Sequence, residues 1–202
     1  YSHFGMISRL QAGASGLPFM PMRQTGALDL EKANPLYRRV RDPYGGEDVV
    51  VVPALCPDVA IVHVQRADSE GNAQIWGILG EQREAAFASK RVILTAEEIV
   101  DADVIRSDPN RTLIPSLVVS AVCHVSWCAH PSYTQGYYDR DNELYLRWAE
   151  ISKDEAGMRA YLDEWVYGVK DREEYLEKLG TETRERLKPG LRLSAPVNYG
   201  SY

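Results

Sequence analysis

The sequence predicts an α/β fold with a mostly parallel sheet flanked by helices and with a helical C-terminal segment. Short apolar runs rich in β-branched residues, at residues 49–52, 59–65, 91–95 and 117–125, are typical of buried strands. The run 81–90, with its alanines and mixed Glu and Arg, predicts a helix between two of them. Strand, helix and strand in this order form a βαβ unit, whose strands are parallel.

The length and composition fit one globular domain. The chain has 202 residues, of which 45% are hydrophobic and 26% charged, so we expect a single domain over residues 1–202. The net charge of −6 gives no general electrostatic basis for binding nucleic acid or anionic membranes. The apolar runs are far shorter than the roughly 20 residues that span a bilayer.

The cysteines indicate a reducing compartment. Cys56, Cys123 and Cys128 are an odd number without CxxC spacing, and nothing at the N-terminus has the pattern of a signal peptide. We therefore expect free thiols in a cytoplasmic protein. His124 and His130 stand near two of these cysteines, but the spacing fits no standard zinc pattern, and we expect no metal site.

The N-terminal part predicts a helix followed by a stiff loop. Residues 3–14 place apolar side chains at helical spacing, and the prolines at positions 18 and 21 exclude a helix over residues 16–26. Arg23, followed by Gln24, suits an anionic ligand because a guanidinium binds a carboxylate through two hydrogen bonds. The alternative is that Arg23 is an exposed loop charge.

The most informative stretch crowds polar side chains around the end of one predicted strand. His63 and Gln65 are two residues apart and share a strand face. Asp68, Gly71 and Asn72 then predict a tight turn, in which the Asx side chains can bond to nearby backbone groups. A ligand at this strand end is one reading. A satisfied core histidine and a self-contained turn are the other.

Two later segments hold further candidates. Glu97 and Glu98 follow the predicted strand 91–95 and point in different directions, so at most one faces a cleft. A helix-start or surface role is the alternative for both. The aromatic and polar loop 126–133 contains His130, which is the best histidine candidate for a site. Packing beneath that loop is its alternative.

The segment 142–188 is predicted to be helical. Asp141 is a plausible N-cap, and aromatic and aliphatic residues at helical spacing mark three helices, the last of which ends at Gly180. Their apolar stripes suit core packing or a subunit contact rather than a cofactor site.

Eight ordered motifs carry a family resemblance. They are GLPF (16–19), VPAL (52–55), PDVA (57–60), HVQRAD (63–68), GNAQ (71–74), TAEEIV (95–100), AHP (129–131) and GYY (136–138). With them the chain resembles the α subunit of the family I CoA-transferases, most closely the glutaconate CoA-transferase type. The resemblance runs from about residue 2 to residue 180.

The resemblance implies both an activity and a partner. These enzymes move CoA from an acyl-CoA to a free carboxylate through a glutamate that forms an acyl anhydride and then a glutamyl-CoA thioester. In heteromeric members that glutamate belongs to the β subunit. We therefore expect no catalytic residue in this chain, a partner β subunit in a heterodimer or heterotetramer, and acyl-CoA and carboxylate as substrates. CoA thioester enters as a substrate, and no permanent cofactor is expected.

The resemblance also implies a set of site residues and a longer polypeptide. The α subunits of this family carry a further N-terminal part with the first strands of the sheet, so this chain is expected to be a C-terminal portion. The expected substrate-binding residues are Arg23, Gln24, His63, Gln65, Asn72 and His130, with Asp68 and Gly71 as a structural turn.

Two other functions remain open at this point. Similar α subunits in bacterial steroid degradation belong to hydrolases that open a ring of a cyclic acyl-CoA with an acidic residue of their own. The chain can also be a non-catalytic assembly subunit whose cleft residues only build an interface.

Overall fold

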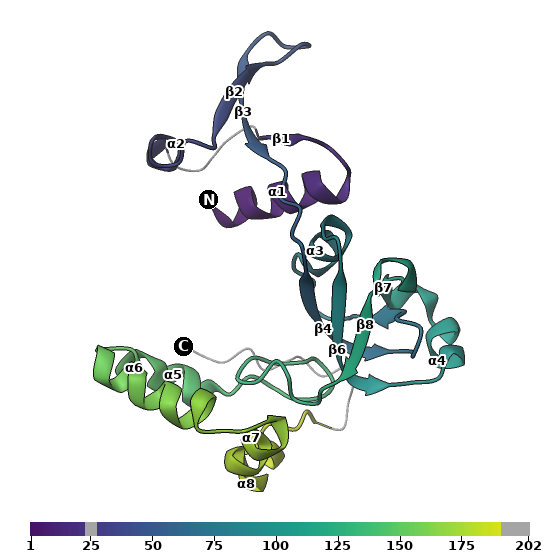
Figure 1. Ribbon diagram of the computed structural model, residues 1–202, viewed down its shortest axis with the longest axis vertical. Coiled ribbons are helices and arrows are strands. Elements are labelled where there is room, and N and C mark those ends of the chain that lie inside the picture. The colour runs from purple at the N-terminus through teal and green to yellow at the C-terminus, as the bar shows by residue number, and fades with distance from the viewer. Residues whose placement is uncertain (23–27, 191–202) are drawn as a thin grey trace.

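The structure is a computed structural model that describes residues 1–22 and 28–190. The predicted ligands Arg23 and Gln24 lie outside the described residues. In Figure 1 the chain forms an open arc, with an N-terminal helix and small sheet at one end, a larger sheet in the middle and a group of helices at the other end. The larger sheet and the helices beyond it position the candidate site.

The N-terminal end of the arc combines a helix with an antiparallel sheet. Helix α1 (His3–Ala14) forms as predicted, and the Ser2 hydroxyl caps it by accepting a hydrogen bond from the Gly5 N–H. The sheet has the order β1-β3-β2, with β1 (Phe19–Met22), β2 (Arg38–Arg41) and β3 (Asp48–Pro53), and helix α2 (Leu28–Ala33) lies between β1 and β2 in the sequence.

The predicted loop 16–26 is partly wrong, because residues 19–22 of it form strand β1. Met20 and Met22 pair with Val52 and Val50 of β3. Proline lacks an N–H donor and is tolerated on an edge strand, which is where β1 lies. Proline content excluded a helix here but did not exclude a strand.

The larger sheet has a parallel centre with a short antiparallel margin, in the order β7-β5-β4-β6-β8. The parallel strands are β4 (Ala60–Ala67), β6 (Val92–Ile99) and β8 (Ala121–His124), and the antiparallel ones are β5 (Ala73–Gln74) and β7 (Thr112–Ile114). Helix α3 (Gln82–Ala88) precedes β6, and α4 (Ala102–Ser107) follows it. The predicted βαβ unit and α/β fold are confirmed.

Two strand boundaries differ from the predicted ones. Strand β6 continues to Ile99, so Glu97 and Glu98 lie within the strand rather than beyond its end. Strand β8 is shorter than the predicted 117–125 because Ser116–Val118 forms a 3-10 turn after Pro115. A second 3-10 turn, Pro109–Arg111, precedes β7.

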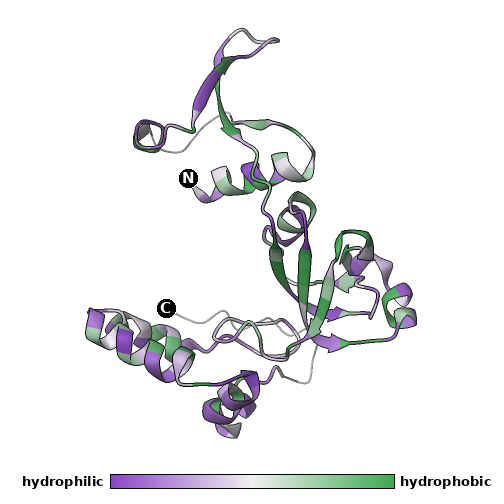
Figure 2. Ribbon diagram, viewed as in Figure 1, coloured by the Kyte–Doolittle hydropathy of each residue, from purple (hydrophilic) through white to green (hydrophobic). Residues whose placement is uncertain are grey.

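One face of the parallel strands carries the hydrophobic core. Val62, Val64, Leu94 and Ala96 alternate along β4 and β6, and they pack with Ala86 of α3. Figure 2 shows the apolar character of these two strands. Leu94 and Ala96 are 0% exposed.

The opposite face of the parallel strands is bare. Ile61 on β4 is 72% exposed, whereas parallel sheets normally have both faces covered. Moreover, β5 pairs with β4 only at Arg66 and Ala67, and no described strand pairs with the same edge of β4 over residues 60–65. By strand alternation, His63, Gln65, Thr95 and Glu97 belong to this bare face.

The C-terminal segment is helical, as predicted. It contains α5 (Asn142–Ile151), α6 (Glu155–Leu162) with a π-helical turn (Asp163–Tyr167), α7 (Arg172–Leu179) and α8 (Thr181–Arg186). Asp141 caps α5 by accepting the Leu144 N–H, and Gly180, at φ +80°, ends α7. Helix α8 is an addition to the three predicted helices.

Two further observations bear on the composition. All three cysteines are free. In the described part of the chain, no helix combines the length and the apolar character that a membrane crossing requires.

The two faces of the sheet predict opposite responses to truncation. Leu94→Ala is expected to cost about 2–5 kcal/mol of unfolding free energy, because it leaves a cavity in the core. Ile61→Ala is expected to cost less than about 0.5 kcal/mol, because an exposed side chain leaves none. Urea unfolding of this chain measures both, and equal losses would contradict the assignment of the two faces.

Candidate functional site

A histidine and a glutamate face each other across two parallel strands. His63 on β4 pairs in register with Thr95 on β6, and Glu97 lies two residues further along the same face. The His63 Nε2–H donates to Glu97 Oε1 at 2.7 Å, and His63 Nδ1 lies 3.0 Å from the Thr95 hydroxyl. The side chain of His63 is 18% exposed, so the pair lies just below the bare face.

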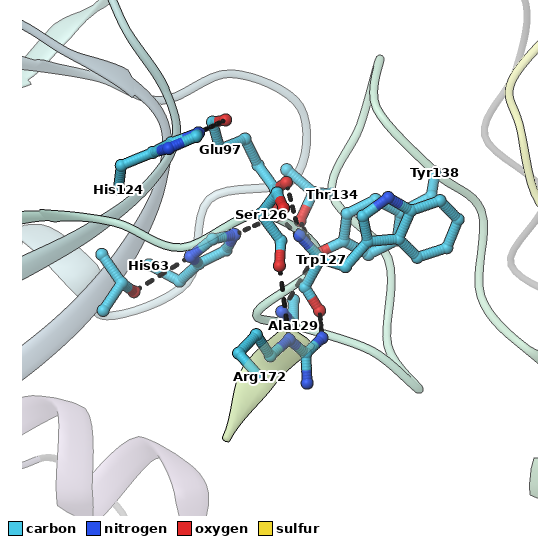
Figure 3. Close-up of polar contacts among 10 residues, drawn as sticks. His63, Glu97, His124, Ser126, Trp127, Ala129, Thr134, Tyr138 and Arg172 are labelled. Atoms are coloured by element: carbon cyan, nitrogen blue, oxygen red, sulfur yellow. Dashed lines mark hydrogen bonds and ion pairs between the residues drawn. The ribbon is translucent and has the colours of Figure 1, made fainter. Parts of the chain in front are cut away.

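Glu97 is the centre of the network drawn in Figure 3. Besides the bond from His63, its Oε1 accepts the Tyr138 hydroxyl at 2.6 Å, and its Oε2 accepts the Trp127 N–H at 2.7 Å. Its side chain is 2% exposed. Burial by itself raises the pKa of Glu97, but the bonds from His63, Tyr138 and Trp127 outweigh it and hold that pKa below its usual value.

The loop after β8 is held by its aromatic residues. Trp127 has φ +61°, which is unusual for a bulky side chain, and its ring stacks on Tyr138 at 4.4 Å. The Tyr138 hydroxyl accepts the Ala129 N–H at 2.9 Å and the Thr134 hydroxyl at 2.8 Å while it donates to Glu97. The loop therefore depends on Tyr138 and Glu97 for its conformation.

Two further contacts connect this loop to its surroundings. Arg172 of α7 donates from its guanidinium to the carbonyl oxygens of Ser126 and Trp127. His124 donates from Nε2 to the Glu97 carbonyl oxygen at 3.0 Å. The strand, the loop and the first turn of α7 thus form one hydrogen-bonded unit.

The predicted turn is confirmed, and it uses the Asn72 side chain. Asp68 Oδ1 accepts the N–H groups of Glu70 and Asn72, and Asp68 Oδ2 accepts the Asn72 amide at 2.8 Å. Asn72 Oδ1 accepts the Ser116 N–H at 3.0 Å. Gly71, at φ +99°, supplies the positive φ that the turn requires. A substrate-binding role for Asn72 stays a prediction, while the structure gives its side chain a turn-closing one.

Gln65 and His130 are both buried and lie apart from each other. Gln65 donates to the Trp76 carbonyl oxygen at 2.8 Å. His130 lies among the C-terminal helices, with Nδ1 2.6 Å from the Tyr175 hydroxyl and Nε2 3.4 Å from Asp141 Oδ2. The structure therefore brings His63 close to Glu97 but places Gln65 and His130 in separate environments. Their predicted ligand contacts stay predictions.

Sequence reasoning missed how the network is joined. It named Glu97 as a residue that could face a cleft, but it gave no role to Trp127 or Tyr138. The Glu97–Tyr138 bond links residues 41 positions apart, and no periodic pattern marks such a contact. The aromatic GYY motif was the available signal, and it pointed to the right loop.

The geometry allows chemistry of a limited kind. A carboxylate that accepts three hydrogen bonds is a weak nucleophile, because its lone pairs are occupied and its charge is stabilised. Among residues 1–22 and 28–190, no three His, Cys, Asp or Glu side chains are grouped as metal ligands. The network suits positioning of the loop rather than covalent chemistry at Glu97.

Comparison with known proteins decides the family. Residues 1–124 match the family model described as Coenzyme A transferase. The chain belongs to this family. It is 44% identical to the α subunit of 3-oxoadipate CoA-transferase from Pseudomonas knackmussii, over 89% of this chain and 63% of that protein.

Other members of the family agree in fold and differ in named activity. The crystal structure of glutaconate CoA-transferase from Acidaminococcus fermentans superposes with a TM-score of 0.85 at 34% identity, over 95% of this chain and 65% of that one. The cholesterol ring-cleaving hydrolase IpdA subunit of Rhodococcus jostii is 27% identical, over 83% of this chain and 60% of that protein. The chain thus spans a little under two thirds of the length of these relatives.

The carboxylate network predicts that a neutral substitute is destabilising. Glu97→Gln is expected to cost about 1–3 kcal/mol of unfolding free energy, because one amide oxygen cannot accept from His63, Tyr138 and Trp127 together. Denaturant unfolding followed by tryptophan fluorescence measures the loss. Glu98→Gln is the matched control, since exposed Glu98 accepts one bond from Tyr137. Equal stability of the two variants would contradict the account.

Asp141 predicts how stability depends on pH. The hydrogen bond from His130 lowers the pKa of Asp141 from 3.8 to about 2; burial opposes this, and Leu144 N–H and Arg186 add to it. A carboxyl with a depressed pKa stabilises the fold above its unfolded pKa and loses that contribution as pH falls through its folded pKa. The unfolding free energy should therefore fall between about pH 4 and pH 2.

The test of this pH dependence is a variant that keeps the helix cap. Asp141→Asn can still cap α5, but it does not titrate. Urea unfolding at several pH values should show a shallower fall between about pH 4 and pH 2 for this variant than for the wild type. Identical slopes would show that Asp141 does not contribute.

Proposed function

We propose that the chain acts as the α subunit of a heteromeric CoA-transferase that moves CoA between an acyl-CoA and a free carboxylate, with a dicarboxylate as the favoured class. The observation that carries this proposal is the 44% identity to an α subunit named for 3-oxoadipate. The solved glutaconate enzyme supports the same substrate class, because both names denote dicarboxylates. CoA thioester is a substrate in this proposal.

The chemistry of Glu97 supports a nucleophile on another chain. Glu97 is the buried carboxylate of the network, and its bonds to His63, Tyr138 and Trp127 leave it unsuited to attack a thioester. We propose that the glutamate that carries CoA belongs to the second subunit. This chain then supplies substrate-binding groups, for which Arg23, Gln24, His63, Gln65, Asn72 and His130 remain the proposed set.

The bare sheet face supports further polypeptide at this position. Ile61 is exposed, and the edge of β4 over residues 60–65 has no described partner. Parallel strands are stable when both faces are covered. We propose that the rest of a longer polypeptide, or the second subunit, covers this face. The three free cysteines support a reducing compartment such as the cytoplasm.

The hydrolase alternative has weaker support. The ring-cleaving relative is 27% identical, against 44% for the transferase relative. The same protein complex can distinguish the two reactions, because transfer requires a free carboxylate and hydrolysis requires only water.

The proposed activity predicts dependence on an added carboxylate. The complete subunit, co-expressed with its second subunit, is incubated with a panel of acyl-CoAs, with and without acetate or a dicarboxylate such as glutarate. Mass spectrometry is expected to show CoA on the added carboxylate. Omitting the carboxylate should abolish product formation.

Two other outcomes would contradict the proposal in different ways. An acyl-CoA that gains one water without regard to added carboxylate would establish the hydrolase reaction. A stable complex with no turnover on any acyl-CoA of the panel would favour an assembly role. Alanine replacement of Arg23 or His130 then separates these roles, because loss of activity with intact assembly excludes a purely structural subunit.

A further inference from the structure

Two hollows adjoin within the C-terminal helical segment, away from the Glu97 network. The first has a volume of about 240 Å³, and three cationic side chains line it, Arg147, Lys178 and Arg186. The second has a volume of about 310 Å³ and is lined by Pro131, Leu144, Tyr145, Trp148 and Tyr161. Leu144 lines both hollows, so they share a wall.

The first hollow contains one unmatched positive charge. Arg186 lies 3.3 Å from Asp141 and 3.3 Å from Glu143, the two carboxylates of the lining. Lys178 bonds to the Glu164 carbonyl oxygen at 2.7 Å and pairs with its carboxylate at 3.4 Å. Arg147 has no hydrogen bond or ion pair with any residue of the described ranges.

The histidine of the first hollow is already occupied. Both ring nitrogens of His130 have partners, Tyr175 and Asp141, and its side chain is 1% exposed. His130 therefore forms part of the fixed wall. The guanidinium of Arg147 is the group left to bind an anion, and a guanidinium binds a carboxylate through two parallel hydrogen bonds.

Arg147 lies near the border between the hollows. Burial raises the pKa of Tyr161, and the positive charge of Arg147 opposes that rise, which places the guanidinium within electrostatic reach of a residue of the second hollow. The position is also favourable by sequence, since Arg147 and Trp148 are neighbours on α5.

The second hollow is apolar and open. The rings of Trp148 and Tyr161 meet edge to face at 5.2 Å, and 40% of Trp148 remains exposed. Exposed aromatic surface is unfavourable in water, and an aliphatic or aromatic group that covers it gains free energy. No residue of α5 or α6 is fully buried, so the hollow lies at an accessible surface of this chain.

We propose that the paired hollows bind an organic carboxylate with an apolar body. The carboxylate bonds to Arg147, and the apolar body lies over Trp148 and Tyr161. This site is separate from the Glu97 network, and the proposal does not depend on CoA transfer. A ligand with both features gains from both hollows, whereas a ligand with one feature gains from one.

The probe is octanoate, which has both features. Isothermal titration of the complete subunit, with its second subunit when the two co-purify, is expected to show saturable binding. Acetate lacks the apolar body and 1-octanol lacks the charge, and each is expected to bind at least about tenfold more weakly, or about 1.4 kcal/mol. Quenching of tryptophan fluorescence gives a second readout, because Trp148 and Trp165 line the two hollows.

Variants assign the binding to these residues. Arg147→Gln is expected to weaken octanoate binding at least about tenfold and to leave 1-octanol binding unchanged, because it removes the charge alone. Arg159→Gln, at an exposed position on α6, is the matched control and should bind octanoate like the wild type. Trp148→Leu should weaken octanoate and 1-octanol alike.

Circular dichroism and thermal unfolding establish that each variant is folded. The proposal is overturned if wild-type protein shows no saturable octanoate binding, or if folded Arg147→Gln binds octanoate within twofold of wild type. Since the readout is binding, either result stands whether or not the complex transfers CoA.

Discussion

The buried carboxylate of Glu97 is the constraint on which the rest of the structure depends. A charge at 2% exposure is tolerated only when hydrogen bonds replace the lost water, and here three donors do so. Each donor comes from a different part of the chain, His63 from β4, Trp127 from the loop after β8 and Tyr138 from further along that loop. One carboxylate therefore fixes the sheet relative to the aromatic loop, and Arg172 extends this connection to α7.

This arrangement has a consequence for function. A carboxylate cannot be both the anchor of a loop and the nucleophile of a covalent reaction, because attack on a thioester would withdraw it from its donors. A CoA-transferase subunit built around such an anchor needs its reactive glutamate elsewhere. The bare face beside His63 and the unpaired edge of β4 show that the described surface is incomplete next to this network.

Local features of the structure could be predicted from the sequence, whereas contacts between distant segments could not. The βαβ unit, the Asp68 turn and the Asp141 cap follow from apolar runs and from residues with local hydrogen-bonding habits. The end of β6 was misplaced because the Glu97 side chain finds its partners only after folding. Strand β1 was missed because its pairing with β3 depends on residues about 30 positions away.

The most direct test of the account asks which chain carries the covalent intermediate. The complex is incubated with acyl-CoA, the glutamyl thioester is trapped with hydroxylamine, and both polypeptides are mapped by mass spectrometry. The account predicts a hydroxamate on one glutamate of the second subunit, while Glu97 stays unmodified. A hydroxamate on Glu97 would show that the carboxylate leaves its three donors to react, and it would contradict the central claim.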